Sequence, residues 1–362
     1  MSTPSISQDI MTNLGNSPGI SLALFLGGLI GAVAFMAIAG LILIYAERKI
    51  CAHFQCRLGP MRVGWHGILQ SVADTIKLLM KEDIVPYAAD KFMHALAPIV
   101  ALAAALMTLI AIPMSAKITL ADSNIGVLYI SAISGIGVLG ILLGGWSSNN
   151  KWSMLGAMRA GAQIISYELS ATLSILAIVM LSGSLKISTI IQSQEAGWWI
   201  WRAPVVGLVA FLSFLISSTA EVNRTPFDLA EGESELAAGF HTEYSGMRFA
   251  FFFLAEYLNL FIVSALGATL FLGGWMPFHL GEWTMFNQIM DLIPQSIWFL
   301  GKTSFMIFVS MWFRWTFPRL RVDQLMKLEW KVLLPIGFVN LLLCAFMTLF
   351  GFYFFSTTTR GF

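Results

Sequence analysis

Charged residues are scarce in this sequence of 362 residues. Asp, Glu, Lys and Arg make up 11% of the chain, whereas 57% of the residues are hydrophobic. Soluble domains contain about a quarter charged residues. The composition therefore excludes an ordinary soluble domain and indicates a membrane protein.

Cysteine is almost absent, with three residues in the whole chain. Cys51 and Cys56 flank His53, and Cys344 lies far away in an apolar run. A structural metal site needs a fourth ligand or a C-x-x-C spacing, and neither is present. We therefore expect reduced structural thiols, no bound metal or iron–sulfur cluster, and no redox activity from this chain alone.

Long apolar runs make up most of the sequence between the few charged residues. Each run can cross, or nearly cross, a hydrocarbon layer of ~30 Å at ~1.5 Å per helical residue. The lengths and the weak alternation exclude a β-barrel. The sequence predicts an all-α membrane protein of one domain with about eight transmembrane helices, at about 19–45, 96–114, 125–146, 161–182, 204–219, 249–275, 297–317 and 332–355.

Basic residues are unevenly distributed between the connections. Most of them follow the first, third, fifth and seventh runs, from Arg48 and Lys49 to Lys327 and Lys331. The other side has only Lys117, Lys186, Arg202 and Arg360. By the positive-inside rule, the first set is cytoplasmic and both chain ends lie outside.

The first cytoplasmic connection contains an amphipathic segment. Apolar residues from Trp65 to Met80 follow helical spacing, and Asp74, Lys77 and Lys81 lie on the opposite arc. This pattern predicts a helix over about 65–81 that lies along the cytoplasmic membrane surface. A re-entrant helix or one packed on the bundle is the alternative.

The connection 221–248 is rich in acidic residues. It holds Glu221, Asp228, Glu231, Glu233, Glu235 and Glu243 between two apolar runs. Thr225 and Pro226 could cap and begin a helix that places Asp228, Glu231 and Glu235 on one face. Close carboxylates cannot all ionise, so their proton affinities are driven apart, which suits a proton relay.

Charges also fall inside the apolar runs, at Glu168, Glu256 and Lys302. A charge at the bilayer centre costs ~2.5–3.5 kcal/mol on insertion scales, so these side chains should face the bundle interior. They could extend the relay. A Lys–Glu pair that only holds helices together is the structural alternative.

Four ordered blocks of residues resemble a family, the H subunits of NADH-quinone oxidoreductase, or respiratory complex I. The first is 221–229 (EVNRTPFDL) with the acids that follow it. The others are Glu47 to Pro60 with Asp74 and Lys77, Lys151 to Glu168, and Arg314 to Lys331. The resemblance spans the first helix to the eighth.

The resemblance implies a role for each group. Arg48, Arg57, Asp74 and Lys77 would border a quinone chamber, with ubiquinone and menaquinone both possible. Glu168, Asp228, Glu231, Glu233, Glu235, Glu243 and Glu256 would form the proton relay. The implied partners are the peripheral-arm subunit carrying the terminal iron–sulfur cluster, the quinone-site subunit, the antiporter-like membrane subunits and lipid. No flavin, metal or nucleic acid is expected, and a bacterial plasma membrane is preferred to the mitochondrial inner membrane.

Three other functions stay open at this point. The chain could anchor a hydrogenase or a deazaflavin-linked or plastid-type dehydrogenase, in which the electron donor differs. It could be a cation/proton antiporter that works alone, for which internal repeats and broken helices are typical. It could also be a passive anchor with structural glutamates.

Overall fold

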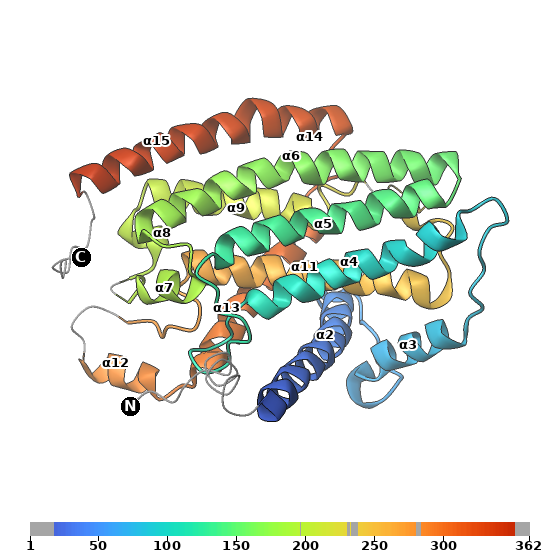
Figure 1. Cartoon of the computed structure of the whole chain (residues 1–362), viewed down its shortest axis with the longest axis horizontal. Helices are drawn as coiled ribbons and strands as arrows, with labels where there is room; N and C mark the ends of the chain where they lie inside the picture. The colour runs from blue at the N-terminus through green and yellow to red at the C-terminus, as the bar shows by residue number, and fades with distance from the viewer. Residues whose placement is uncertain (1–17, 196, 230–231, 233–237, 280–283, 352–362) are drawn as a thin grey trace.

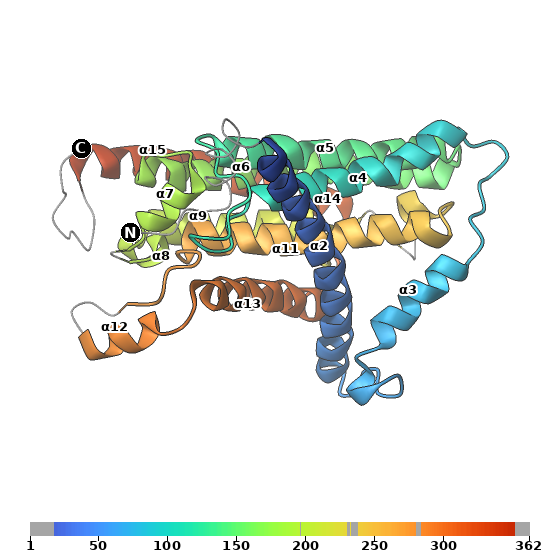
Figure 2. The same cartoon turned by 60° about the horizontal axis from the view of Figure 1, so that its bottom comes forward.

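The computed structural model describes residues 18–195, 197–229, 232, 238–279 and 284–351. Its described part is helical throughout, which confirms the all-α fold class. The longer helices lie roughly along one direction in Figure 1, whereas α2 is strongly inclined to them (Figure 2). The principal helices are α2 (Pro18–Phe54), α4 (Lys91–Ala111), α5 (Gly126–Ser147), α6 (Lys151–Ser182), α9 (Val206–Glu221), α11 (Gly246–Phe271), α13 (Gln295–Thr316) and α15 (Leu334–Phe350).

Shorter elements connect these helices. On one side of the bundle, α3 (Gln70–Met80) projects from the end of α2, and a 3-10 turn, Trp65–Gly67, precedes it (Figure 2). The other short elements are α7 (Ile187–Gln192), α8 (Trp199–Arg202), the 3-10 turn η2 (Gly239–His241), α12 (Thr284–Asp291), α14 (Val322–Leu328) and the π-helix η3 (Glu329–Leu333).

Seven described helices are long and apolar enough to cross a membrane, with α14, η3 and α15 forming one continuous span, Val322–Phe350. The expected fifth span, α9, has 16 residues and is shorter than the others. Both α2 and α6 extend beyond the apolar runs that predicted them, because their polar turns are stabilised by buried contacts. In the first turn of α6, for example, the buried Ser153 hydroxyl donates to the Phe240 carbonyl at 2.8 Å.

Helix ends follow ordinary capping chemistry. The Asp90 side chain accepts hydrogen bonds from the backbone N–H groups of Phe92 and Met93 and so caps α4. The Asn150 side chain does the same for α6 through Trp152 N–H. Gly183 ends α6 in the left-handed conformation that glycine adopts without strain.

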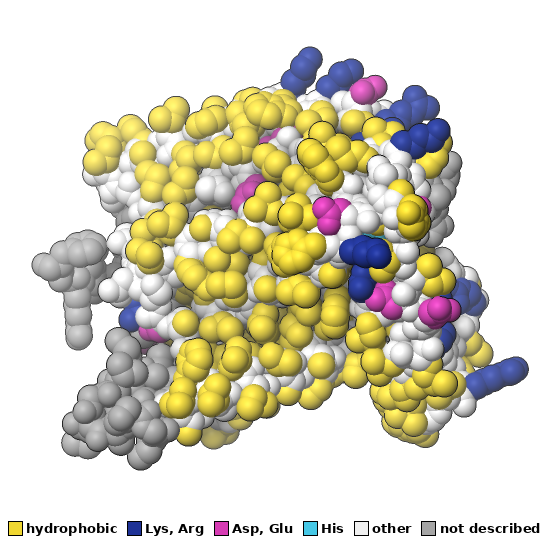
Figure 3. Space-filling view, turned by 45° about the vertical axis from the view of Figure 1, so that its right-hand side comes forward, with side chains coloured by type: hydrophobic (Ala, Val, Ile, Leu, Met, Phe, Trp, Pro, Cys, Tyr) yellow, Lys and Arg dark blue, Asp and Glu magenta, His cyan; other side chains and the backbone are white. Residues whose placement is uncertain are grey.

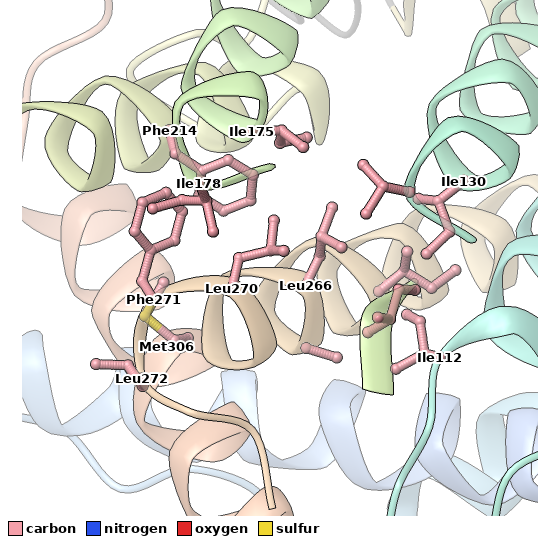
Figure 4. Packing of buried hydrophobic residues seen from close by; sticks show 14 of the residues in the cluster. Ile112, Ile130, Ile175, Ile178, Phe214, Leu266, Leu270, Phe271, Leu272 and Met306 are labelled. Atoms are coloured by element: carbon pink, nitrogen blue, oxygen red, sulfur yellow. The ribbon is translucent and has the colours of Figure 1, made fainter. Parts of the chain in front are cut away.

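The core lies between α6, α9, α11 and α13. Phe214, Ile178 and Phe271 pack together there with Leu270 and Met306 (Figure 4). Many large apolar side chains are exposed, and the face in Figure 3 is mostly apolar with charged side chains most numerous toward its right-hand side. The helices thus form a bundle with an apolar outer belt, in which any buried charge needs a partner from a neighbouring helix.

Candidate functional site: two cavities joined by buried ion pairs

Charged side chains from three elements meet where α2, α11 and α13 contact one another. Glu47 comes from α2, Arg224 from the turn after α9, and Arg314 from α13. One Arg224 nitrogen, Nη1, donates to both Glu47 carboxylate oxygens at 2.9 Å. Arg314 forms a further ion pair with the same carboxylate. Glu47 and Arg224 are only 6% and 4% exposed, so the pair is buried in the protein.

Arg224 also reaches a second carboxylate. Its Nε lies 2.9 Å from Glu256 Oε1 on α11. The guanidinium is 4.6 Å from the centre of the Tyr257 ring, a favourable cation–π position. Burial lowers the pKa of Arg224, but the carboxylates of Glu256 and Glu47 outweigh it, and the pKa lies above its ordinary value. Arg224 is therefore a permanent cation between two acids.

A cavity of about 70 Å³, here called the inner cavity, adjoins Glu256. A space of this size holds ordered water where polar groups line it. The polar members of its lining come from α4, α5, α9, α11, η2 and the turn after α9, and they are Thr108, Ser134, Glu221, Asn223, His241, Glu256 and Asn259.

Glu168 on α6 lies beside this cavity. Ser134 lines the cavity, and its hydroxyl donates to Glu168 Oε1 at 3.3 Å. Glu168 also acts electrostatically on Glu221, which lines the same cavity. The inner cavity thus has Glu256 and Glu221 in its lining, and the second predicted intramembrane acid, Glu168, is bonded to the lining residue Ser134.

His241 belongs to the lining of the inner cavity. It is buried, and burial lowers its pKa to about 4. The Phe240 and Phe249 rings contact it edge to face, at centroid distances of 4.7 and 5.3 Å. At neutral pH this side chain is therefore an uncharged hydrogen-bonding group.

A second cavity, here called the outer cavity, has a volume of about 400 Å³. Glu47, Arg48, Arg57 and Gln70 provide its polar lining, and Cys51, Pro60 and Trp315 also line it. Asp74 on α3 forms an ion pair with Arg48, and Lys77 Nζ lies 3.9 Å from the same carboxylate group. The four residues expected at a quinone chamber thus lie at the junction of α2 and α3. Glu47 lies between this cavity and Arg224.

The remaining acids are placed differently. Asp228 lies in the turns after Arg224, and Glu243 accepts a hydrogen bond of 2.6 Å from Asn150 Nδ2. Neither lines the inner cavity. Glu231, Glu233 and Glu235 lie outside the described residues.

The expected helix start at Thr225 and Pro226 is wrong. Residues 222–229 form turns, in which Phe227 N–H donates to Arg224 O at 2.8 Å. The Gln163 side chain on α6 donates to the carbonyls of Ala220 and Phe227 at 2.8 and 2.7 Å. These bonds satisfy the backbone in a folded turn and leave no need for a helix.

Lys302 has a role other than pairing with glutamate. Its Nζ donates to the Met276 carbonyl at 2.7 Å and lies 5.0 Å from the centre of the Trp198 ring. Glu256 pairs instead with Arg224. The structural alternative of an ion pair between Lys302 and Glu256 is therefore wrong.

Four residues of the site were not among the predicted site residues: Glu47, Glu221, Arg224 and Arg314. Glu221 opens the acidic connection, and Glu47 and Arg224 are charges at the ends of apolar runs, which is the signal that could have identified them. Their pairing has no local signature, because Glu47 is 177 positions from Arg224 and 267 from Arg314. Within the described ranges, no group of three His, Cys, Asp or Glu residues could hold a metal ion.

Comparison with known proteins places the chain in a family. The NADH dehydrogenase family matches residues 27–345. The chain is 54% identical to the H subunit of NADH-quinone oxidoreductase from Bacteroides fragilis over 322 residues, which cover 89% of this chain and 90% of that protein. It is 52% identical to the H subunit from Bacillus cytotoxicus over 303 residues (83% and 87%), and 48% identical to that from Geobacillus kaustophilus over 336 residues (92% and 96%). With its buried charges and membrane-length helices, this chain belongs to the NADH dehydrogenase family, alongside the H subunits of bacterial NADH-quinone oxidoreductases.

Proposed function

We propose that this chain is the membrane subunit of a proton-translocating NADH-quinone oxidoreductase in which quinone reduction drives a proton relay. The family match and the names of the relatives support the complex. One observation supports the mechanism: Glu47 lines the outer cavity, and Arg224 connects its carboxylate to Glu256 in the lining of the inner cavity.

The outer cavity suits a quinone head group. Arg48, Arg57 and Gln70 offer N–H donors for the carbonyl oxygens of a quinone, and Trp315 and Pro60 offer flat apolar surface. Electrons would arrive from a peripheral-arm subunit that carries the terminal iron–sulfur cluster. This chain would supply the membrane wall of the chamber, next to the quinone-site subunit. The donor set fits ubiquinone and menaquinone equally.

Charge changes in the outer cavity would act on the relay through Arg224. Quinone reduction takes up two protons and two electrons, so it alters the field at Glu47. A unit charge ~5 Å from a carboxyl changes its protonation free energy by about 3 kcal/mol at an effective dielectric of ~20. When Glu47 holds Arg224 less firmly, Arg224 stabilises the ionised form of Glu256 more strongly. Glu256 would then release a proton that it had taken up earlier in the cycle.

The released proton would pass along the inner cavity. Glu256, Glu221 and Ser134 line this cavity, and Glu168 accepts the Ser134 hydrogen bond at its far side. Asp228, Glu231, Glu233, Glu235 and Glu243 would supply protons from the cytoplasmic loop. The antiporter-like subunits of the complex would accept the proton from Glu168.

The same proposal places the chain in a bacterial plasma membrane, with both chain ends on the outer side and α3 along the cytoplasmic surface. The bacterial relatives and the bias of basic residues support it. A hydrogenase anchor and an antiporter that works alone are not favoured, since the relatives named above are subunits of NADH-quinone oxidoreductase.

Exchange of Glu256 for Gln in the intact complex tests the proposal. The amide keeps the size of the side chain but cannot carry a proton, so we expect proton pumping in proteoliposomes to fall at least tenfold. Glu195→Gln, which removes an exposed carboxyl, is the control and should pump like the wild type. Unchanged pumping in an assembled Glu256→Gln complex would support a passive anchor instead.

A further inference from the structure

Glu329 is a fully buried acid that the relay described above does not use. It is the first residue of the π-helix η3, at the side of α6 away from the inner cavity, and its exposed fraction is 0%. The Ser170 hydroxyl on α6 donates to its Oε1. Oε2 is buried and has no hydrogen-bond partner among the described residues.

The surroundings of Glu329 do not suit a permanent charge. No ion pair joins it to a Lys or Arg within the described part of the chain, and Leu325 and Leu333, one turn before and after it, belong with Tyr167 to a buried apolar cluster. An ionised carboxylate with one hydroxyl donor costs several kcal/mol in such a site, whereas the neutral acid costs far less.

Three polar residues of α6, Gln163, Tyr167 and Ser170, follow helical spacing between Asn223 and Glu329. Asn223 lines the cavity, and Gln163 Nε2 donates to its Oδ1 at 3.2 Å. Tyr167 follows on α6 one turn later, and Ser170 one turn after that. All three α6 side chains are buried, and Gln163 Oε1 is a second buried oxygen without a partner among the described residues.

The backbone at Glu329 departs from regular helix. The π-helix spans Glu329–Leu333, and the Tyr167 hydroxyl donates to the Leu325 carbonyl at 3.0 Å, in the turn before it. Single π-helical turns are frequent at functional sites, where they change the direction of a side chain at a cost in helix stability. Here the irregular turn lies where the acid enters the α6 interface.

We infer that Glu329 is a proton-binding site at the end of a side branch of the relay, reached from the inner cavity along Asn223, Gln163, Tyr167 and Ser170. The inference rests on the proposed function. During turnover the carboxyl takes up or returns one proton, so that a single O–H bond forms or breaks and no electrons are transferred. Ser170 positions the acid, and Gln163 and Tyr167 connect it to the cavity.

Redox-induced infrared difference spectra of the intact complex test this inference. A carboxylic acid that changes its protonation or hydrogen bonding during quinone reduction contributes a C=O band that shifts in D₂O. Glu329→Gln should lose one such band that the wild type and the control Glu195→Gln retain. Ser170→Ala leaves Glu329 in place but removes its hydrogen-bond donor, so it should shift the same band to higher frequency. This second variant provides the test if the Glu329→Gln complex does not assemble.

The possible outcomes separate the inference from the proposed function. Loss of the band in Glu329→Gln, or its shift in Ser170→Ala, supports the inference. Spectra like the wild type in both variants, while Glu256→Gln loses a band, overturn the role of Glu329 and leave the main relay standing. Spectra like the wild type in all three variants overturn both.

Discussion

Arg224 Nη1 lies 2.9 Å from each oxygen of the Glu47 carboxylate, although the two residues are separated by 177 positions in the chain. The pair is buried, and each member has a further partner: Arg314 for Glu47, and Glu256 for Arg224. Four charges therefore form one alternating chain of acid and base across three helices and a turn. A change at one end is transmitted through Glu47 and Arg224, because these two central members are buried and weakly screened by water.

Removal of the central acid should destabilise the bundle. Glu47→Gln takes this carboxylate from Arg314 and leaves Arg224 with Glu256 alone, and breaking one side of a buried pair costs about 3–5 kcal/mol. We expect a lower thermal midpoint of the complex and loss of quinone reductase activity. Glu82→Gln, at an exposed acid, is the control. A thermal midpoint equal to that of the control would contradict the buried ion-pair network.

The ion pair between α2 and α3 should behave differently. Arg48 and Asp74 have side-chain exposures of 45% and 23%, so Asp74→Asn should change the free energy of unfolding by less than about 1 kcal/mol. It should still raise the KM for quinone several-fold, since the pair holds Arg48 at the outer cavity. Lys77→Gln should have the smaller effect, because Lys77 is 69% exposed and 3.9 Å from Asp74. Equal KM values in the wild type and Asp74→Asn would place the quinone elsewhere.

These two ion pairs illustrate what the sequence could reveal. The apolar runs predicted the all-α class and the approximate position of each span, and the acid-rich connection marked the region of the site. The sequence could not reveal which charges pair, since Glu47, Arg224 and Arg314 meet only through the packing of α2, α13 and the turn after α9. For the same reason Glu329 gave no signal, as its donor Ser170 is 159 positions away.

Helix limits were missed where polar residues are buried. The charges at Glu47 and Arg48 argued for the end of the first helix, but α2 continues to Phe54 because Glu47 is neutralised inside the bundle. The helix predicted to begin at Pro226 does not begin there. Hydrogen bonds from the Gln163 side chain to backbone carbonyls stabilise a turn in its place. A hydropathy profile contains no information on buried ion pairs or on hydrogen bonds from side chains to the backbone.

His241 should give the protein an acid-sensitive stability. Its pKa in the folded chain is about 4, below the ordinary value of 6.5, so between these values the unfolded chain binds a proton that the folded chain does not. Stability therefore falls as the pH drops from about 6.5 to 4, by up to about 3 kcal/mol at 1.36 kcal/mol per unit. His241→Gln should flatten this part of the profile of thermal midpoint against pH.

The exposed His53 provides the matched control for that profile. His53→Gln removes an imidazole from the protein surface and should keep the wild-type slope. A wild-type slope in His241→Gln as well would show that other groups cause the acid sensitivity.

Asn150 should stabilise α6 in two ways. Its side chain caps the helix through Trp152 N–H at 3.0 Å and donates to Glu243 at 2.6 Å. Asn150→Ala loses both contacts and should cost about 1–2 kcal/mol. Asp90→Ala removes only the cap of α4 and should cost less, which paired thermal melts of the two variants would measure. If Asp90→Ala lost more stability than Asn150→Ala, the contact between Asn150 and Glu243 would contribute no measurable stability.

The number of protons pumped per quinone reduced in an Arg224→Lys complex tests the central claim most directly. Lysine keeps the positive charge, but one ammonium group cannot reproduce the separate contacts of Nη1 with Glu47 and Nε with Glu256. The account predicts an assembled complex that still reduces quinone but pumps less than half as many protons for each quinone. A wild-type ratio in this variant would contradict coupling through Arg224.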